Sequence, residues 1–252
     1  MKYLNEILID WNNILDSNDT IIQTSSVISE MDKLSTSKIP CIYYPINFKE
    51  LSDIIEQKIN ESINNGSKVT DLRAISLSNI EVGKQYILTS LFEDLNVKQY
   101  PEIINVSHWD TTGCTDFNYC FYDCKGLKRI IGLNTWNTSK VESMIGMFAF
   151  CSDLEDIGDL SKWNTSKLRS INEIFDNCVS LSKLDDNKKL VIDYETWKPN
   201  GGKPRISSDG NIIGYRLRTF NIVKNTNFNI FDFIRFKNLP SNLDPDRLVT
   251  KC

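Results

Sequence analysis

The stretch WNTSKVESMIGMFAFCSDL, residues 136–154, decides the fold because its pattern returns at a fixed spacing along the chain. Its tryptophan has counterparts 27 residues earlier and 27 residues later, and three further residue types recur in the same register. The recurring columns are Trp109, Trp136 and Trp163; Phe121, Phe148 and Phe175; Cys124, Cys151 and Cys178; and Leu127, Leu154 and Leu181. A fixed period of roughly 20–50 residues indicates a repeat architecture, in which each unit buries its apolar side against its neighbours.

The middle repeat predicts one short helix followed by one short extended segment. Ser139 and Glu142 have the spacing of a capping box, which begins helices. The apolar residues that follow are three or four positions apart, as on one face of a helix: Val141, Met144, Met147, Phe148 and Cys151. Residues 154–160 then favour a strand. Stacked repeats of this kind predict an α/β solenoid with a parallel sheet along one side.

Less regular repeats flank the three regular ones. Residues 72–92 resemble a repeat with a few extra residues, and residues 190–197 return to the strand-then-tryptophan ending. Trp197 lies 34 residues after Trp163, seven more than the period, which predicts a loop inserted near residues 185–189. Insertions of this kind often lie on the binding face of a repeat protein.

Both ends of the chain carry material for caps. Residues 2–15 and 47–64 show helical spacing of apolar residues, and the second helix has a capping pair in Asn47 and Glu50. Turn signals around residues 203–207 and 212–223 predict a hairpin. We therefore expect a helical N-terminal cap over residues 1–70, the repeats over 71–197 and a β-rich C-terminal cap over 198–252.

Composition and charge exclude several classes of protein. The net charge of −4 over 252 residues disfavours a nucleic-acid binder. No segment approaches the roughly 20 apolar residues that a membrane-spanning helix needs, and the acidic residues near the N-terminus do not fit a signal peptide. We expect no nucleic-acid partner, no membrane insertion, and a cytoplasmic or virion location rather than surface display.

The chemistry-bearing residues favour structural roles. His108 is the single histidine, and Cys114, Cys120 and Cys124 follow it, so a zinc site or a cysteine–histidine nucleophile is the alternative reading. However, Cys120 and Cys124 stand on predicted core positions, and no phosphate-binding or metalloprotease motif is present. We expect buried, reduced cysteines and no catalytic, cofactor-binding or metal-binding residue.

Two other patterns leave alternatives open. The tryptophan column is interpreted as core, although an exposed aromatic ladder would bind carbohydrate or peptide. Basic residues near the C-terminus form either a solvated surface or a docking site for an acidic partner; they are Lys198, Lys203, Arg205, Arg216 and Arg218.

The pattern W-[DN]-T-S-x-V-x-x-M-x-x-M-F-x-x-C-x-x-L of Trp136–Leu154 resembles the BspA-like leucine-rich repeat family, as does the lead-in of residues 44–51. The resemblance covers roughly residues 43–197. It departs from the family at the methionine columns, where Phe117, Ile171, Cys120 and Ile174 stand. That family occurs in bacterial, protist and viral surface or virion-associated proteins. The resemblance implies a leucine-rich-repeat-type solenoid of helix-plus-strand rungs that binds proteins or surfaces and is not an enzyme.

The expected function is a non-catalytic protein–protein interaction or structural assembly module, such as a virion or phage component. The alternatives are a surface adhesin that recognises a host protein or glycan, and a metal- or thiol-dependent enzyme. The partner-binding residues expected lie between the apolar columns on the strand side of the repeats: Lys128, Arg129, Glu155, Asp156, Ser182 and Lys183.

Overall fold

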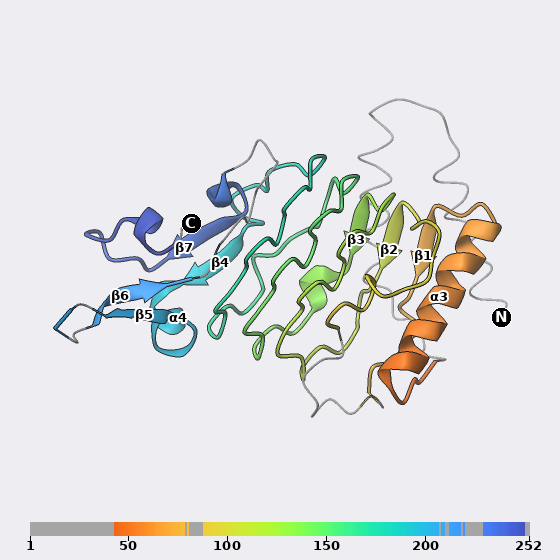
Figure 1. Cartoon of the computed structure of the whole chain (residues 1–252), viewed down its shortest axis with the longest axis horizontal. Helices are drawn as coiled ribbons and strands as arrows, with labels where there is room; N and C mark the ends of the chain where they lie inside the picture. Colours follow the sequence, from red (N-terminus) through yellow and green to blue (C-terminus); the bar gives the residue numbers. More distant parts are fainter. Residues whose placement is uncertain are drawn as a thin grey trace.

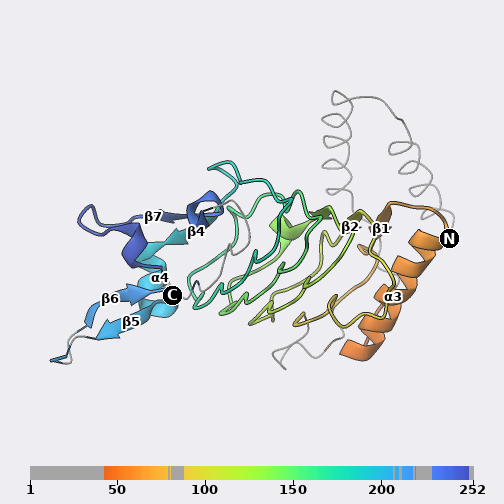
Figure 2. The same cartoon turned by 45° about the horizontal axis from the view of Figure 1, so that its top comes forward.

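The computed structural model describes residues 43–78, 80, 88–206, 208–209, 212–217, 219 and 229–249. The repeats form a layered stack along the long axis of the molecule, with one long helix at one end and a group of strands at the other (Figure 1). The same order is seen in the tilted view of Figure 2. The helix predicted over residues 2–15 lies outside the described residues.

The helix at the first end of the stack is α3, Phe48–Asn64, and its prediction from the sequence is confirmed. It begins at Asn47, whose side chain accepts a hydrogen bond from the backbone N–H of Glu50 at 2.9 Å. Leu51, Ile55 and Ile59 lie four residues apart and are fully buried. This stripe covers the first layer of the repeat core, because a stack of repeats leaves an apolar end that must be covered.

Three short strands form the parallel sheet expected along one side of the repeats. They are β1 (Val69–Asp71), β2 (Ile103–Asn105) and β3 (Arg129–Ile131), in that order in the sheet. An isolated bridge between Arg129 and Asp156 extends the same pairing into the next repeat. A short 3₁₀ helix, η1 (Leu133–Thr135), follows β3.

The predicted helix in each regular repeat is wrong. Among the described residues the α-helices are α3 and α4 (Tyr194–Asn200), and both lie outside the three regular repeats. The segment 139–151, where the capping box and apolar spacing predicted a helix, consists of turns and irregular backbone, with isolated bridges from Ser143 to Asp116 and to Ser170. The leucine-rich-repeat-type solenoid of helix-plus-strand rungs is therefore not the fold of this chain.

The reason is that the backbone of this segment bonds to the next repeat instead of to itself. The N–H groups of Met144, Gly146 and Phe148 donate to carbonyls of residues 170, 172 and 174, at 2.8–3.0 Å. Residues 117–123 bond in the same way to residues 143–149. We call these bonded segments the turn ladder. Since these donors are satisfied between repeats, no helical hydrogen bonds are needed.

Successive turns reproduce the apolar spacing of a helix. Val141, Cys151 and Leu154 each donate a backbone hydrogen bond to the carbonyl three residues earlier, so apolar residues recur at steps of three. Gly146 and Phe150 have left-handed φ angles of 57° and 63°, which interrupt any helix. The Asn137 side chain accepts a hydrogen bond from the N–H of Ser139, so the residues predicted to begin a helix form a turn instead.

The tryptophan column lies in the core. Trp109, Trp136 and Trp163 are 2–4% exposed, and the first two stack at 6.3 Å between ring centroids. Each indole N–H donates to a backbone carbonyl of the preceding repeat, as Trp136 does to Val106 at 3.3 Å and Trp163 to Leu133 at 2.7 Å. The phenylalanine column stacks beside it, and the cysteine column is buried and free of disulfides.

The C-terminal elements cover the other end of the stack. Strand β4 (Leu190–Asp193) pairs in parallel with β7 (Ile234–Lys237), and β5 (Lys203–Ile206) pairs with β6 (Ile212–Arg216) in the hairpin that the sequence predicts. The short 3₁₀ helices η2 (Ile230–Asp232) and η3 (Pro245–Arg247) flank β7.

Phe233 joins this part of the molecule to the repeats. Its ring lies 4.5 Å from that of Phe175, and it is 1% exposed. Because β4 belongs to the predicted repeat region and β7 to the predicted C-terminal cap, one sheet crosses the expected boundary at residue 198. The three predicted domain ranges stay a prediction.

Candidate functional site

The six residues predicted to bind a partner lie on three successive repeats, and we call them the strand-side surface. The backbone N–H groups of Glu155 and Asp156 donate to the carbonyl of Lys128 at 2.8 and 3.2 Å. The N–H of Ser182 donates in turn to the carbonyl of Glu155 at 3.4 Å. Arg129 and Lys183 are the sequence neighbours of Lys128 and Ser182. The bonding between repeats therefore brings all six residues side by side.

Charges of both signs alternate across this surface. The Arg129 guanidinium lies 2.5 Å from the Asp156 carboxylate, and Lys128 lies 3.2 Å from Glu102. Lys68 reaches the same Glu102 carboxylate at 3.5 Å. The sequence analysis missed Glu102 and Lys68, although Glu102 directly precedes β2 much as Lys128 precedes β3. The lysine pairs with Glu102 are exposed and contribute little to stability, so their main effect is to orient the side chains.

Glu155 and Lys183 are exposed and form no ion pair within the described part of the chain. Ser182 beside them is exposed as well. This end of the strand-side surface therefore presents an acid and a base that are open to groups outside the chain.

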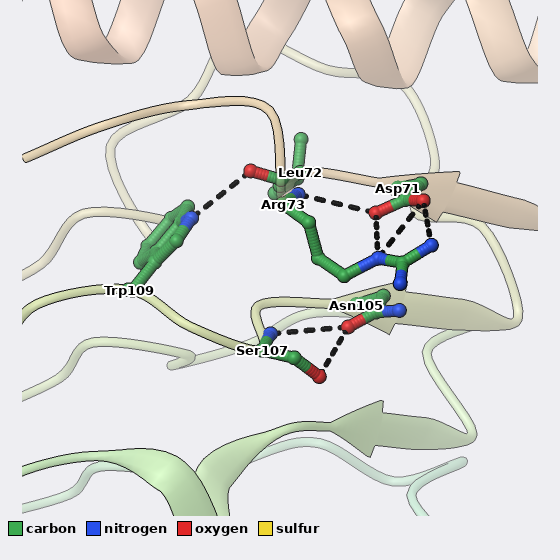
Figure 3. Close-up of polar contacts among 6 residues, drawn as sticks. All are labelled: Asp71, Leu72, Arg73, Asn105, Ser107 and Trp109. Carbon is green, nitrogen blue, oxygen red and sulfur yellow. Dashed lines mark hydrogen bonds and ion pairs between the residues drawn. The ribbon is translucent and has the colours of Figure 1, made fainter. Parts of the chain in front are cut away.

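A second polar cluster lies at the end of β1 and is enclosed (Figure 3). The Asp71 carboxylate accepts from the Arg73 guanidinium at 2.7 and 2.9 Å, and the two side chains are 4% and 0% exposed. In the next repeat, the Asn105 side chain accepts from the N–H and hydroxyl of Ser107 at 3.0 and 2.7 Å. Because these groups are shielded from solvent, their hydrogen bonds fix the turns after β1 and β2.

The residues considered for metal or thiol chemistry are not assembled into a site. His108 is exposed, as expected, and its backbone N–H donates to the Thr135 hydroxyl at 3.1 Å. Burial, with the charges of Asp116 and Asp110, raises the pKa of Cys114 to about 12. Within the described ranges, no group of three or more His, Cys, Asp or Glu side chains is arranged to hold a metal ion.

The cysteines of the repeats are buried in the core of the stack. Burial raises the pKa of the Cys120 and Cys124 thiols well above the usual range. The thiols of Cys151 and Cys178 donate to backbone carbonyls of the preceding repeat, at 2.7 and 2.9 Å. A protonated, buried thiol serves packing, whereas nucleophilic attack and metal binding require the thiolate.

The basic residues near the C-terminus are only partly described. Lys198 pairs with Glu195 at 3.6 Å and lies 5.3 Å above the ring of Tyr194. Lys203 and Arg205 stand on β5 and Arg216 stands on β6, while Arg218 lies outside the described residues. Docking of an acidic partner here stays a prediction.

The sequence analysis missed an aromatic group on the turn ladder, which we call the turn-side cluster: Tyr119, Tyr122 and Phe150. The ring centroids of Tyr119 and Tyr122 are 5.7 Å apart, and those of Tyr122 and Phe150 are 5.3 Å apart. Phe150 is 41% exposed, and the two tyrosines are half-buried. The available signal was an aromatic residue at position 150, where the neighbouring repeats have Asp123 and Asn177.

Among the residues that the structure describes, no helix has the length and apolar character needed to span a membrane. No curated protein and no solved structure matches the chain. One protein family does: residues 87–196, which contain the three regular repeats, are similar to the family described as "Mycoplasma protein of unknown function, DUF285".

Proposed function

We propose that this chain is a non-catalytic module that binds another protein through its strand-side surface, as a structural part of a larger assembly such as a virion. The observation that carries the proposal is the side-by-side arrangement of Lys128, Glu155 and Ser182 and their neighbours over three repeats. A repeat stack offers such an extended surface without a pocket, which suits a partner of comparable size.

The charges of the strand-side surface supply specificity for a partner. Glu155 and Lys183 are exposed without ion pairs within the described residues, so each is available to a charge of opposite sign. The Arg129–Asp156 and Lys128–Glu102 pairs hold further charges in fixed positions. Complementary charges across an interface steer association and suppress wrong partners.

The resemblance of Trp136–Leu154 to the BspA-like family supports the same proposal, since that family occurs in surface or virion-associated proteins. The similarity of residues 87–196 to a family of unknown function is compatible with this proposal, and it does not point to a particular activity. The burial of the repeat cysteines supports a non-catalytic role.

The test is affinity capture with the full chain from the cells or particles that produce it, followed by mass spectrometry. Lys183→Glu and Glu155→Lys are expected to reduce the captured partner at least about tenfold, since one reversed charge pair costs on the order of several kcal/mol. Lys140→Glu is the matched control, because Lys140 is exposed and lies outside the strand-side surface.

Two outcomes would contradict the proposal. One is that the wild-type chain retains no protein under gentle conditions. The other is that every variant retains the same proteins equally, which would remove the strand-side surface as the binding site.

A further inference from the structure

We propose that a second surface of the repeat stack, the turn-side cluster with the carboxylates of Glu93 and Glu173, binds a protein segment that presents arginine or lysine side chains. This surface belongs to the turn ladder and shares no residue with the strand-side surface. The inference therefore goes beyond the proposed function and does not depend on it.

The three rings form one aromatic surface that spans two repeats. Along the turn ladder, Phe117 and Phe121 are fully buried, whereas Tyr119 and Tyr122 between and after them are half-buried. Tyr122 bridges the cluster, with its ring at 78° to Tyr119 and at 52° to Phe150. Solvent therefore reaches part of these aromatic rings, which lie outside the fully buried core.

The backbone conformation at two of these rings is unfavourable for their residue types. Tyr119 and Phe150 have left-handed φ angles of 57° and 63°. The positions matching Phe150 in the neighbouring repeats hold Asp123 and Asn177, which tolerate this conformation. The fold thus accepts small polar residues here. Bulky residues kept in a strained conformation are typical of functional sites.

Gly146 provides room for the first ring. It occupies the position that Tyr119 and Glu173 occupy in the adjacent repeats. A Cβ on Gly146 would lie 2.6 Å from both Cδ1 and Cε1 of Tyr119. The Tyr119 ring therefore lies directly over Gly146, between its own repeat and the repeat that carries Glu173.

Carboxylates lie near the rings, and two of them form no ion pair with the residues that the structure describes. The N–H of Phe92 donates to the carbonyl of Cys120 at 2.9 Å and that of Gly146 to the carbonyl of Asn172 at 2.8 Å, so Glu93 and Glu173 stand on segments bonded to those of the rings. Burial and then the negative charges of Glu173 and Glu93 raise the pKa of Tyr119. Glu93 accepts a hydrogen bond from the Ser90 hydroxyl, but within the described residues neither Glu93 nor Glu173 forms an ion pair. Asp123 nearby is already paired with Lys125 at 2.9 Å.

The aromatic rings and the carboxylates together favour a positively charged ligand. A guanidinium or ammonium group is attracted to the face of an aromatic ring and to a carboxylate beside it, and arginine also stacks on the ring plane. A nucleic acid or an acidic peptide would be repelled by the same carboxylates. A neutral sugar would stack on the rings but would leave Glu93 and Glu173 without a partner.

The experiment measures binding of a fluorescein-labelled peptide with four Gly-Ser-Arg units to the full chain by fluorescence anisotropy. The same peptide with citrulline in place of arginine is the neutral probe of equal shape. We expect the arginine peptide to bind at least tenfold more tightly, with an affinity that falls as the salt concentration rises.

Two variants locate the site. Tyr119→Asn removes a ring at a position where asparagine suits the backbone, and Glu173→Gln removes one charge; each is expected to weaken binding at least fivefold. Asp53→Asn removes one exposed carboxylate charge from α3, outside both surfaces, and is expected to leave binding unchanged. Circular dichroism establishes that each variant is folded.

Several results would overturn the inference. These are equal binding of the citrulline peptide, unchanged affinity of the Glu173→Gln variant, or competition by maltohexaose, which would make the cluster a sugar site. Loss of partner capture by the Lys183→Glu variant with intact peptide binding would separate this surface from the strand-side surface.

Discussion

Left-handed backbone recurs at matched positions of the turn ladder, and the residue types there differ in how well they tolerate it. Tyr119, Gly146 and Glu173 share one position, with φ angles of 57° in all three. Only glycine takes this conformation without steric cost, and asparagine tolerates it better than most other residues. Substitutions at these positions therefore separate backbone strain from side-chain function.

Replacing Glu173 with asparagine is expected to stabilise the protein. Glu173 forms no ion pair within the described part of the chain, so the main change is relief of strain, about 0.5–1 kcal/mol of added unfolding free energy. Urea denaturation followed by circular dichroism measures it. Glu155→Asn is the control, because Glu155 is exposed and has no left-handed φ. A destabilised Glu173→Asn variant would argue against strain at this position.

Comparing Gly132 with Gly158 separates the cost of steric crowding at a glycine from the cost of its left-handed backbone conformation. Both have left-handed φ angles, 98° and 73°. A Cβ on Gly132 would lie 2.3 Å from the backbone nitrogen of Ser107, whereas one on Gly158 would have nothing within 4 Å. We expect Gly158→Ala to cost about 1–2 kcal/mol of unfolding free energy and Gly132→Ala a further 1–3 kcal/mol or so. Equal melting temperatures for the two variants would contradict this.

At the scale of the elements, the buried Asp71–Arg73 pair lies at the end of β1, where this strand pairs with β2. Asp71→Asn keeps a side-chain oxygen that accepts from the N–H of Arg73, and it removes both the charge and the second acceptor oxygen, which receives the Arg73 guanidinium at 2.7 Å. The variant loses the charge-assisted hydrogen bonds from the Arg73 guanidinium to the second carboxylate oxygen inside the core, so we expect a loss of about 3–5 kcal/mol in unfolding free energy. Equilibrium denaturation measures this loss.

A double variant serves as the control for that prediction. Adding Arg73→Met to Asp71→Asn removes the remaining charge and is expected to restore part of the lost stability. If the double variant is less stable than Asp71→Asn alone, the arginine contributes more through packing than through its charge.

The sequence predicted the recurring columns, a parallel sheet along one side and helix α3, because these follow from spacing and capping within short segments. The strand expected over residues 154–160 is wrong, because this segment holds only an isolated bridge at Asp156. The sequence also did not predict that residues 139–151 form turns. Apolar steps of three to four arise both from a helix and from successive turns, and only the bonds of Met144 and Phe148 to the next repeat distinguish the two. Those bonds join residues 26 positions apart, which no local pattern contains.

The candidate surfaces were predictable to different degrees. The side-by-side arrangement of Lys128, Glu155 and Ser182 could be expected from the sequence because variable positions next to apolar columns recur in register, whereas their role in binding stays a prediction. The turn-side cluster was missed because it depends on the position of the Tyr119 ring over Gly146, and on a backbone conformation that a helix prediction excludes.

For the whole molecule, the apolar core is continuous from Leu51 in α3 to Phe233 and Val249 near the C-terminal end. Layers that share one core are expected to unfold together, since each layer depends on its neighbours for burial. The C-terminal elements therefore belong to the same cooperative unit as the repeats.

Phe233→Ala tests this continuity. Loss of a fully buried ring is expected to cost about 3–5 kcal/mol. The denaturation midpoints from tryptophan fluorescence and from far-ultraviolet circular dichroism should shift together. Phe150→Ala is the matched control, because its ring is 41% exposed and a smaller effect is expected. An unchanged fluorescence midpoint in the Phe233→Ala variant would mean that the C-terminal part unfolds independently.

The indole hydrogen bonds give the stack a polarity. The indoles of Trp109, Trp136, Trp163 and Trp197 all donate toward the N-terminal side, to Leu72, Val106, Leu133 and Leu168. Every regular repeat thus carries one donor for the repeat before it and one acceptor for the repeat after it. A tandem duplication of 27 codons would insert a repeat with both, so the array can lengthen by whole units during evolution while α3 and Phe233 keep closing its ends.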